Sequence, residues 1–211
     1  MRNYTSLYFQ SRRAQAFAYF YTLHPLLYMI GKFISKLFFK ATGWKLNGTL
    51  APQDRRCVMV AAPHTSNWDF VYARAAFFMM DAPIRYTIKK EFMKFPFGPI
   101  LKAIGALPID RSRNTRMVDA MIRIFEETPG DMCVMVTPEG TRKYQPRWRR
   151  GFYHVAMGAK VPIVLGYLDY AKKEAGIGPT IIPSGDVEAD IEKIMAFYRT
   201  KTGKYPEQGV R

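Results

Sequence analysis

Patterns typical of buried strands and of amphipathic helices alternate along this chain from Arg56 onward, and this alternation restricts the possible fold more than any other feature. The expected strands are residues 57–63, 84–89, 106–110, 131–138, 161–170 and 180–184. The expected helices are residues 69–80, 97–105, 115–127, 151–160 and 186–200, the last with Asp186 as its N-cap. Such a strict succession is typical of an α/β fold with a mostly parallel sheet flanked by helices.

The N-terminal part of the chain has a different pattern. No charged residue lies between Arg13 and Lys32, and aromatic and aliphatic residues dominate this stretch. It is short for the roughly 20 apolar residues of a spanning helix, and Pro25 lies near its middle, so we expect a re-entrant helix or one lying in the membrane interface. Lys32, Lys36 and Lys40 then recur at every fourth position, which predicts a basic amphipathic helix. Such a helix suits a membrane surface or a hairpin packed on the protein's own core.

These patterns divide the chain into three parts. We expect membrane-associating helices at residues 1–45, an α/β domain at residues 46–200, and a loosely held polar tail at residues 201–211. Residues 14–31 lack the small-residue cleavage pattern of a secretory signal, so we expect the N-terminus to be retained.

The composition limits the kinds of partner. Against 17 acidic residues the chain has 32 Lys and Arg, a formal charge of +15, which favours nucleic acid, an anionic bilayer or a phosphorylated substrate. A nucleic-acid-binding protein is disfavoured, because no recognised motif of that class is present and the aromatic segment at residues 17–30 would have no use in a soluble binder. Cys57 and Cys133 lie in apolar runs, which argues against a disulfide framework and indicates a reducing, cytoplasmic compartment.

A histidine and an aspartate follow the first expected strand. His64 leaves the end of the strand, and Asp69 stands five positions later at the start of a helix. Open α/β sheets place their sites at such strand ends. Asp69 can fold back onto one imidazole nitrogen, which leaves the other nitrogen free to accept a hydroxyl proton. Alone, the spacing fits equally an Asp69 N-cap beside an ordinary loop histidine.

Two further strand ends carry polar residues. The segment Thr137–Lys143 places a carboxylate, a glycine and two cations after one buried run. The segment Asp110–Arg113 follows another and adds guanidinium groups, which can grip a phosphate through two parallel hydrogen bonds. A solvated basic loop would explain the second segment as well. Together, however, these strand ends can converge on one cleft with His64.

At this point the sequence resembles the glycerophosphate and lysophosphatidate acyltransferase family. Four blocks match in order across residues 64–163: His-x4-Asp at His64 and Asp69, Gly105 through Ile109-Asp110-Arg111, Glu139-Gly140-Thr141-Arg142, and Val161-Pro162-Ile163. Lys89-Lys90-Glu91 followed by Pro96-Phe97-Gly98 also looks like the family's segment between its first two blocks. Thr137 departs from the aromatic residue that many members carry, which leaves the acceptor subclass open.

The resemblance implies a role for each matched position. His64 would be the general base and Asp69 its partner. The acceptor would be bound by Arg111, Glu139, Gly140, Thr141, Arg142, Lys89 and Lys90, while Val161, Pro162 and Ile163 would line the acyl-chain path. The family also carries an N-terminal helical element that docks on membranes.

The reaction implied by the resemblance is transfer of a fatty acyl chain from acyl-CoA or acyl-carrier protein to a lysophospholipid hydroxyl. The acceptor remains open between lysophosphatidate and a lyso-aminolipid or another acceptor without a phosphomonoester, and a catalytically silent lipid-binding module is the other alternative. We expect no cofactor and no metal, because His24 and His154 form no ligand spacing. We expect the protein at the cytoplasmic face of an anionic membrane, as a peripheral or monotopic protein.

Overall fold

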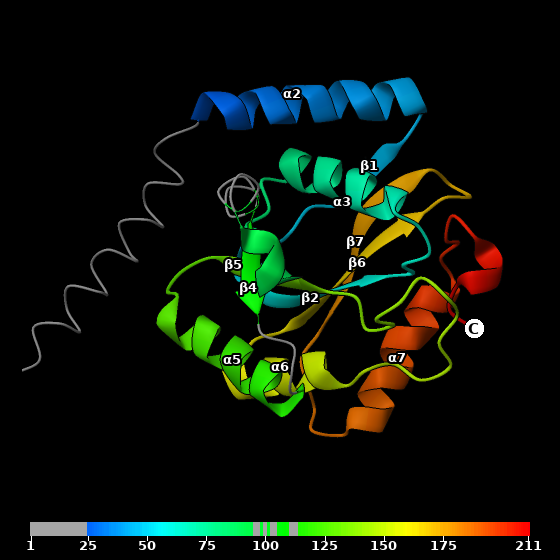
Figure 1. Cartoon of the computed structure of the whole chain (residues 1–211). Coiled ribbons are helices and arrows are strands. Elements are labelled where there is room, and N and C mark those ends of the chain that lie inside the picture. Colours follow the sequence, from blue (N-terminus) through cyan, green and yellow to red (C-terminus); the bar gives the residue numbers. More distant parts are fainter. Residues whose placement is uncertain (1–24, 95–97, 99–100, 102–104, 110–113) are drawn as a thin grey trace, which may run out of the picture.

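The computed structural model describes residues 25–94, 98, 101, 105–109 and 114–211, which form a sheet with helices on both faces (Figure 1). The strands are β1 (Lys45–Asn47), β2 (Arg56–Ala62), β3 (Ile84–Lys89), β4 (Ala106–Ile109), β5 (Met132–Val136), β6 (Ile163–Asp169) and β7 (Glu174–Ile181). The α-helices are α2 (Pro25–Thr42), α3 (Trp68–Met79), α5 (Asn114–Glu127), α6 (Gly151–Ala159) and α7 (Val187–Arg199). Short 3-10 turns occur at Pro52–Asp54, Lys90–Met93 and Pro206–Gln208.

The strand order in the described part of the chain is β1-β7-β6-β2-β5-β3-β4. Strands β4, β3, β5, β2 and β6 run parallel to one another, and β7 pairs antiparallel with β6. In the centre of the sheet Val58 of β2 lies opposite Val134 of β5 and Ile163 of β6. The mostly parallel α/β fold expected from the sequence is therefore confirmed, and the five parallel strands end at one common edge.

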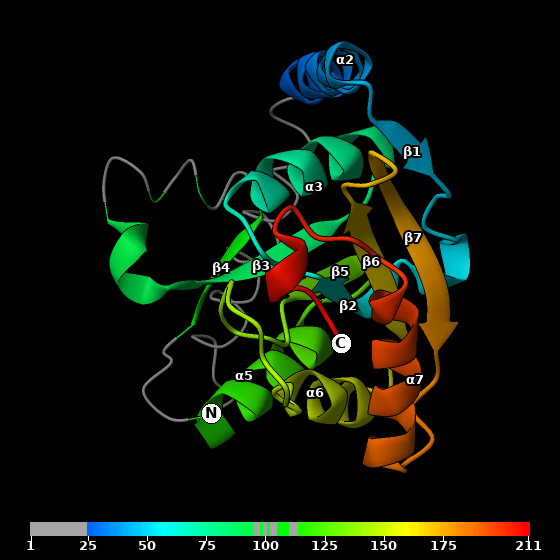
Figure 2. The same cartoon turned by 90° about the vertical axis from the view of Figure 1, so that its right-hand side faces the viewer.

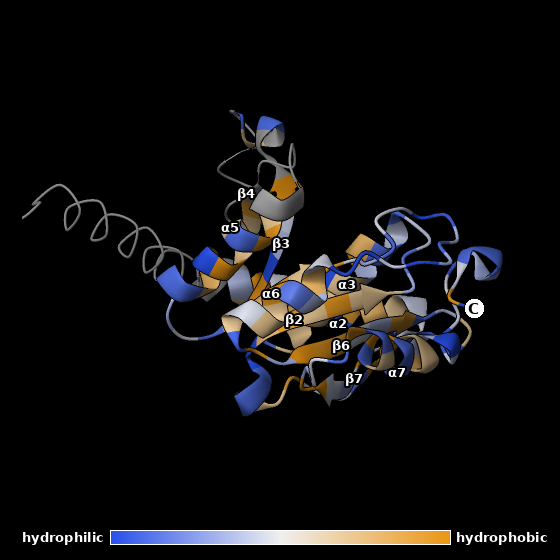
Figure 3. Cartoon of the chain, turned by 90° about the horizontal axis from the view of Figure 1, so that it is seen from below, coloured by the Kyte–Doolittle hydropathy of each residue, from blue (hydrophilic) through white to orange (hydrophobic). Residues whose placement is uncertain are grey.

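The helices form two layers. Helices α5, α6 and α7 cover one face of the sheet, and α3 with α2 outside it covers the other, as two views at right angles show (Figures 1 and 2). The larger core lies between the sheet and the first layer and includes Phe125, Tyr153 and Tyr198. Hydrophobic residues concentrate on the central strands β2 and β6 (Figure 3). A sheet covered on both faces needs apolar side chains on both, which explains the continuous apolar runs of its strands.

Local sequence features set the helix ends and their spacing. The side chain of Asp186 accepts a hydrogen bond of 3.0 Å from the Ala189 N–H, so it is the N-cap of α7 that the sequence predicted. Gly158 of α6 faces Ile122 of α5 so closely that a β-carbon would lie 2.4 Å from its Cδ1. Glycine at this position therefore allows α5 and α6 to pack closely over the sheet.

The structure differs from the sequence analysis at several places. β7 begins at Glu174, six residues before the expected 180–184, and the three-residue strand β1 was not expected. Most of the helix expected at 97–105 lies outside the described residues, as do residues 1–24. α2 runs without a break through the boundary expected near residue 31. Among the described helices, none has the length and hydropathy needed to cross a bilayer.

Candidate active site

The strand ends that the sequence singled out meet at the common edge of the sheet. β2 leads to His64, β5 leads to the turn at Thr137–Gly140, and β6 leads to Tyr170. Because these three strands are adjacent and parallel, the residues that follow them are neighbours in space.

His64 and Asp69 form a close pair. The Nδ1 atom of His64 lies 3.1 Å from Oδ2 of Asp69, and the histidine side chain keeps 22% of its surface exposed. The same carboxylate oxygen accepts hydrogen bonds from the backbone N–H groups of Thr65, at 2.8 Å, and Ser66, at 2.9 Å. Asp69 therefore fixes the loop that carries His64 as well as the imidazole ring itself.

The Asp69 carboxyl is held in its ionised form. Burial opposes ionisation, but hydrogen bonds from His64, Tyr170 and the Ser66 backbone outweigh it, so the pKa of Asp69 lies below its usual value. A buried carboxylate beside an imidazole stabilises the imidazolium that forms when the ring accepts a proton. The pair therefore has the geometry that general-base chemistry requires.

Glu139 supports the same loop from the neighbouring strand. Its Oε1 atom accepts a hydrogen bond of 3.0 Å from the backbone N–H of His64, and its Oε2 atom is buried without a hydrogen-bond partner among the described residues. Burial raises the pKa of Glu139 to about 7, and the hydrogen bond from His64 lowers it by less. The structure thus places Glu139 against the backbone of the loop that carries His64.

The turn around Glu139 depends on a glycine. Gly140 has a φ of 67°, a left-handed conformation that side chains disfavour, and its N–H donates to the Thr137 carbonyl. A β-carbon there would lie 2.7 Å from Nε of Arg149, whose own backbone N–H donates to the Pro138 carbonyl at 3.0 Å. Glycine therefore lets the Arg149 guanidinium lie against the turn.

A cavity of about 600 Å³ opens beside the pair. Its polar lining includes His64, Asp69, Gly140, Arg142 and Arg149. Its apolar lining comes from both helical layers and from β5, with Phe70, Phe77, Met117, Met121, Met135 and Phe152 among the residues. The volume falls in the range of small-molecule sites, and the lining combines a long apolar surface with cations near the base.

The structure brings some of the expected substrate residues to this cavity. Gly140 and Arg142 line it, and Thr141 lies between them, with Oγ1 accepting from the Lys143 N–H. Lys89 ends β3 and Lys90 begins the following turn, at the same edge of the sheet, while their side chains lie outside the description. Arg111 lies outside the described residues.

The three residues expected along the acyl-chain path lie elsewhere. Val161 and Ile163 are buried, and Ile163 pairs with Val58 near the start of β2, whereas His64 follows the end of that strand. Val161, Pro162 and Ile163 are absent from the described lining of the cavity. The apolar surface close to His64 comes instead from α3, α5 and α6.

Three hydrogen bonds around the site were not expected from the sequence. The hydroxyl of Tyr170 donates to Oδ1 of Asp69 at 2.7 Å. The tail was expected to be loosely held, but it contacts the loop that carries His64, because the Tyr205 N–H donates to Oγ1 of Thr65. The Thr202 carbonyl also accepts a hydrogen bond from the Tyr170 N–H. The signal for Tyr170 was its position as the last residue of the expected strand 161–170, a strand end like the one that singled out His64.

The cysteines are unsuited to nucleophilic catalysis. Cys57 and Cys133 are fully buried, and the Cys133 thiol donates to the Arg55 carbonyl at 3.5 Å. The hydrogen bond with Cys133, together with burial, raises the pKa of the Cys57 thiol far above its usual value. Within the described part of the chain, no three His, Cys, Asp or Glu side chains are grouped as metal ligands.

Comparisons with known proteins show the family and a similar fold. The model of the family described as Acyltransferase matches residues 45–165, more than half of the chain. The fold is similar to the crystal structure of the 1-acyl-sn-glycerophosphate (LPA) acyltransferase PlsC from Thermotoga maritima, with a TM-score of 0.50 and 15% sequence identity over 79% of this chain and 74% of that one. No curated protein matches the sequence significantly.

Proposed function

This chain belongs to the acyltransferase family, and on that premise we propose that it transfers a fatty acyl chain from a thioester donor to the hydroxyl of a lysophospholipid such as lysophosphatidate. The observation that carries the proposal is the His64–Asp69 pair, whose side chains are 3.1 Å apart and line a cavity together with apolar side chains and Arg142. The similar protein from Thermotoga maritima is described as acting on 1-acyl-sn-glycerophosphate, which supports this choice of acceptor.

In the proposed reaction His64 is the general base. Asp69 holds the ring with the proton on Nδ1, so Nε2 removes the proton from the acceptor hydroxyl as its oxygen attacks the thioester carbonyl carbon. The carbon–sulfur bond then breaks, and the imidazolium returns the proton to the departing thiolate. The products are an ester and a free thiol, and neither a covalent enzyme intermediate nor a cofactor is needed. A positioned base of this kind contributes about 10²- to 10⁴-fold in rate.

The lining of the cavity suits the two parts of the acceptor. Arg142 and Arg149 offer guanidinium groups to a phosphate, and charge-assisted hydrogen bonds of this kind are the strong ones in proteins. The apolar side chains of α3, α5 and α6 offer a surface for an acyl chain. The donor is acyl-CoA or acyl-carrier protein, both of which present the same thioester.

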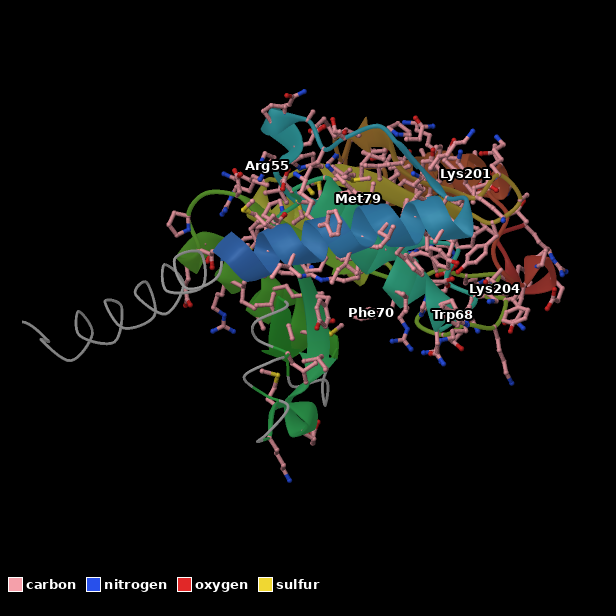
Figure 4. All side chains as sticks on the ribbon, turned by 90° about the horizontal axis from the view of Figure 1, so that it is seen from above. Arg55, Trp68, Phe70, Met79, Lys201 and Lys204 are labelled. Atoms are coloured by element: carbon pink, nitrogen blue, oxygen red, sulfur yellow. The ribbon has the colours of Figure 1, made fainter. Side chains whose placement is uncertain are left out.

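Helix α2 supports the proposal that the enzyme works on an anionic membrane surface at its cytoplasmic face. Met29, Phe33, Ile34 and Leu37 are between 58% and 69% exposed along one side of the helix, although such side chains are usually covered. Seen from above, α2 lies across the top of the molecule (Figure 4). The C-terminal part of α2 contacts the N-terminal part of α3, where the ring centroids of Phe38 and Tyr72 are 5.1 Å apart. The proposed membrane contact would therefore lie near the active site.

The test incubates the purified protein with palmitoyl-CoA or palmitoyl-acyl-carrier protein and a panel of lysolipids, and identifies the products by mass spectrometry. We expect phosphatidate from lysophosphatidate. His64→Ala should lower the rate at least 100-fold, because it removes the base, while His154→Ala, at an exposed histidine of α6 away from the cavity, should not. Turnover by His64→Ala close to that of the wild type would overturn the mechanism. Acylation of a lyso-aminolipid in place of lysophosphatidate would refute the proposed acceptor.

A further inference from the structure

Tyr170 contacts the catalytic pair without belonging to the motifs that revealed it. We propose that Tyr170 is a positioning residue, which holds the Asp69 carboxylate and through it the His64 ring in the orientation needed for proton transfer. This inference rests on the proposed function. It is carried by the 2.7 Å hydrogen bond from the Tyr170 hydroxyl to Oδ1 of Asp69.

The two oxygens of Asp69 are held by different parts of the molecule. Oδ2 faces His64 and also accepts from the Thr65 and Ser66 N–H groups, all within the same loop. Among the described residues, Oδ1 accepts its hydrogen bond from Tyr170 alone. An aspartate side chain has a broad torsional preference about its last bond, so a carboxylate fixed at one oxygen can still rotate. The Tyr170 hydroxyl removes this freedom from outside the loop.

The position of the hydroxyl is itself fixed by aromatic packing. Ring centroids of Tyr170 lie 4.9 Å from Trp44 and 5.8 Å from Tyr72, both in edge-to-face geometry. Trp44 and Tyr72 are stacked on each other with centroids 4.1 Å apart, and Phe39 at the end of α2 packs against Trp44. Edge-to-face and offset-stacked rings are the favourable arrangements of aromatic pairs. The aromatic cluster thus gives Tyr170 a single orientation, with its hydroxyl toward Asp69.

Tyr170 is suited to donate a hydrogen bond and unsuited to other roles. Burial and the hydrogen bond to Asp69 raise the pKa of its hydroxyl well above the usual value, so the group stays protonated in the pH range of the reaction. Tyr170 is also absent from the described lining of the cavity, so it acts on the substrate through Asp69. These properties are those of a positioning residue.

The primary test is Tyr170→Phe, which keeps the ring and removes the hydroxyl. We expect kcat to fall roughly 10- to 100-fold with KM within twofold of the wild type, because the free energy of one hydrogen bond to a charged group corresponds to a rate change of this size. The matched control is Tyr153→Phe, which also removes a buried tyrosine hydroxyl bonded to a carboxylate, at 2.8 Å from Oδ2 of Asp190, but lies away from the pair. The control should lose thermal stability without the loss of kcat.

A double-mutant cycle separates positioning from general damage. If Tyr170 acts through Asp69, Tyr170→Phe should cost less than threefold in a protein that already carries Asp69→Asn. A full loss in both backgrounds would overturn the inference, because it would show that the hydroxyl serves the fold. A kcat for Tyr170→Phe equal to that of the wild type would overturn it as well.

A measurement without substrate keeps this inference distinguishable from the proposed function. Nitrogen-15 NMR of labelled histidines, with the His64 signal assigned by its loss in His64→Ala, reports which ring nitrogen carries the proton. The wild type should show mainly the Nδ1-protonated tautomer, and Tyr170→Phe a mixture of tautomers. An inactive wild type with this spectral change would refute the proposed function and leave the positioning role standing. An unchanged tautomer in Tyr170→Phe would refute the positioning role.

Discussion

The loop that carries His64 and helix α2 differ in the kinds of side chain that are buried and exposed there. Asp69 of α3 and Glu139 of the turn after β5 have buried carboxyl groups that accept hydrogen bonds from the backbone of this loop. On α2, apolar side chains such as Phe33 and Leu37 are mostly exposed. The loop depends on single groups in fixed positions, whereas the helix offers an area to which many side chains contribute. Single substitutions should therefore have large effects in the loop and small effects on the helix.

The strongest test of this contrast is Asp69→Asn. The amide keeps the shape of the side chain but removes the charge that supports the imidazolium, so we expect kcat to fall by about 10²- to 10⁴-fold. Initial rates with lysophosphatidate measure the effect, and Asp119→Asn, at an exposed position on α5, is the control. A loss below threefold would mean that Asp69 serves mainly to bind the N–H groups of Thr65 and Ser66. Single substitutions around the loop would then have effects as small as those expected on α2.

Glu139→Gln tests how the buried Glu139 carboxyl changes the free energy of unfolding with pH. The pKa of Glu139 is raised from 4.5 to about 7 in the folded protein, so between these values the unfolded chain releases a proton that the folded protein keeps. The free energy of unfolding should therefore fall as pH rises through this window, by up to about 3 kcal/mol. Glu139→Gln should lack this fall, as denaturation at pH 4.5 and pH 8 would reveal.

The control for this comparison is Glu126→Gln on the exposed side of α5. Its unfolding free energy should follow that of the wild type at each pH. Parallel curves for Glu139→Gln and the wild type would show that the buried carboxyl does not titrate in this range.

Arg142 lies between the two extremes, because it lines the cavity but is exposed. Arg142→Ala should raise the KM for lysophosphatidate by roughly 10- to 100-fold and change the KM for a neutral lysolipid little, since a guanidinium gains little from an uncharged headgroup. The neighbouring cation Lys143 is absent from the described lining, so Lys143→Ala is the control. Equal effects of Arg142→Ala on both acceptors would contradict a phosphate-binding role.

The smallest effect is expected on α2. Phe33→Ser should weaken binding to anionic liposomes by roughly three- to tenfold, because one exposed ring supplies only part of the apolar area. The triple change of Met29, Phe33 and Leu37 to serine should abolish it. Ile182→Ser is the control, as Ile182 is 72% exposed in a loop after β7. Cosedimentation of the triple variant at the level of the wild type would remove α2 from the proposed membrane contact.

Much of the fold and part of the site could be predicted from the sequence. Strands β2, β5 and β6 have nearly continuous apolar runs because both faces of the sheet are covered, and such runs are visible without a structure. Parallel strands end at a common edge, so the sequence allowed Glu139 and Arg142 to converge with His64 on one cleft, and the structure added that β2 and β5 are neighbours in the sheet. The close contact of His64 with Asp69 was expected for a different reason, because a separation of five positions lets Asp69 fold back onto the imidazole ring.

The remaining features depend on contacts that no local pattern encodes. β1 has only three residues and is too short to show a periodic pattern. The antiparallel direction of β7 comes from its short connection to β6, and no periodic pattern encodes strand direction. Polar composition suggested a loose tail, yet Tyr205 hydrogen-bonds Thr65 through its backbone, which every residue type has. Glu139 matched a motif, but only the structure showed that its carboxylate binds the His64 backbone.

The contacts of Tyr170 and Tyr205 with the residues around His64 also affect the order in which the site forms during synthesis. His64 and Asp69 leave the ribosome long before Tyr170 and Tyr205, whose partners lie 101 and 140 positions earlier in the chain. A nascent chain that has emerged as far as Glu139 also lacks β6, the neighbour of β2 in the sheet. On the roles proposed above, the base is fully oriented only after Tyr205 has been translated, and a prematurely terminated chain that ends before β6 carries His64 and Asp69 without the support of Tyr170.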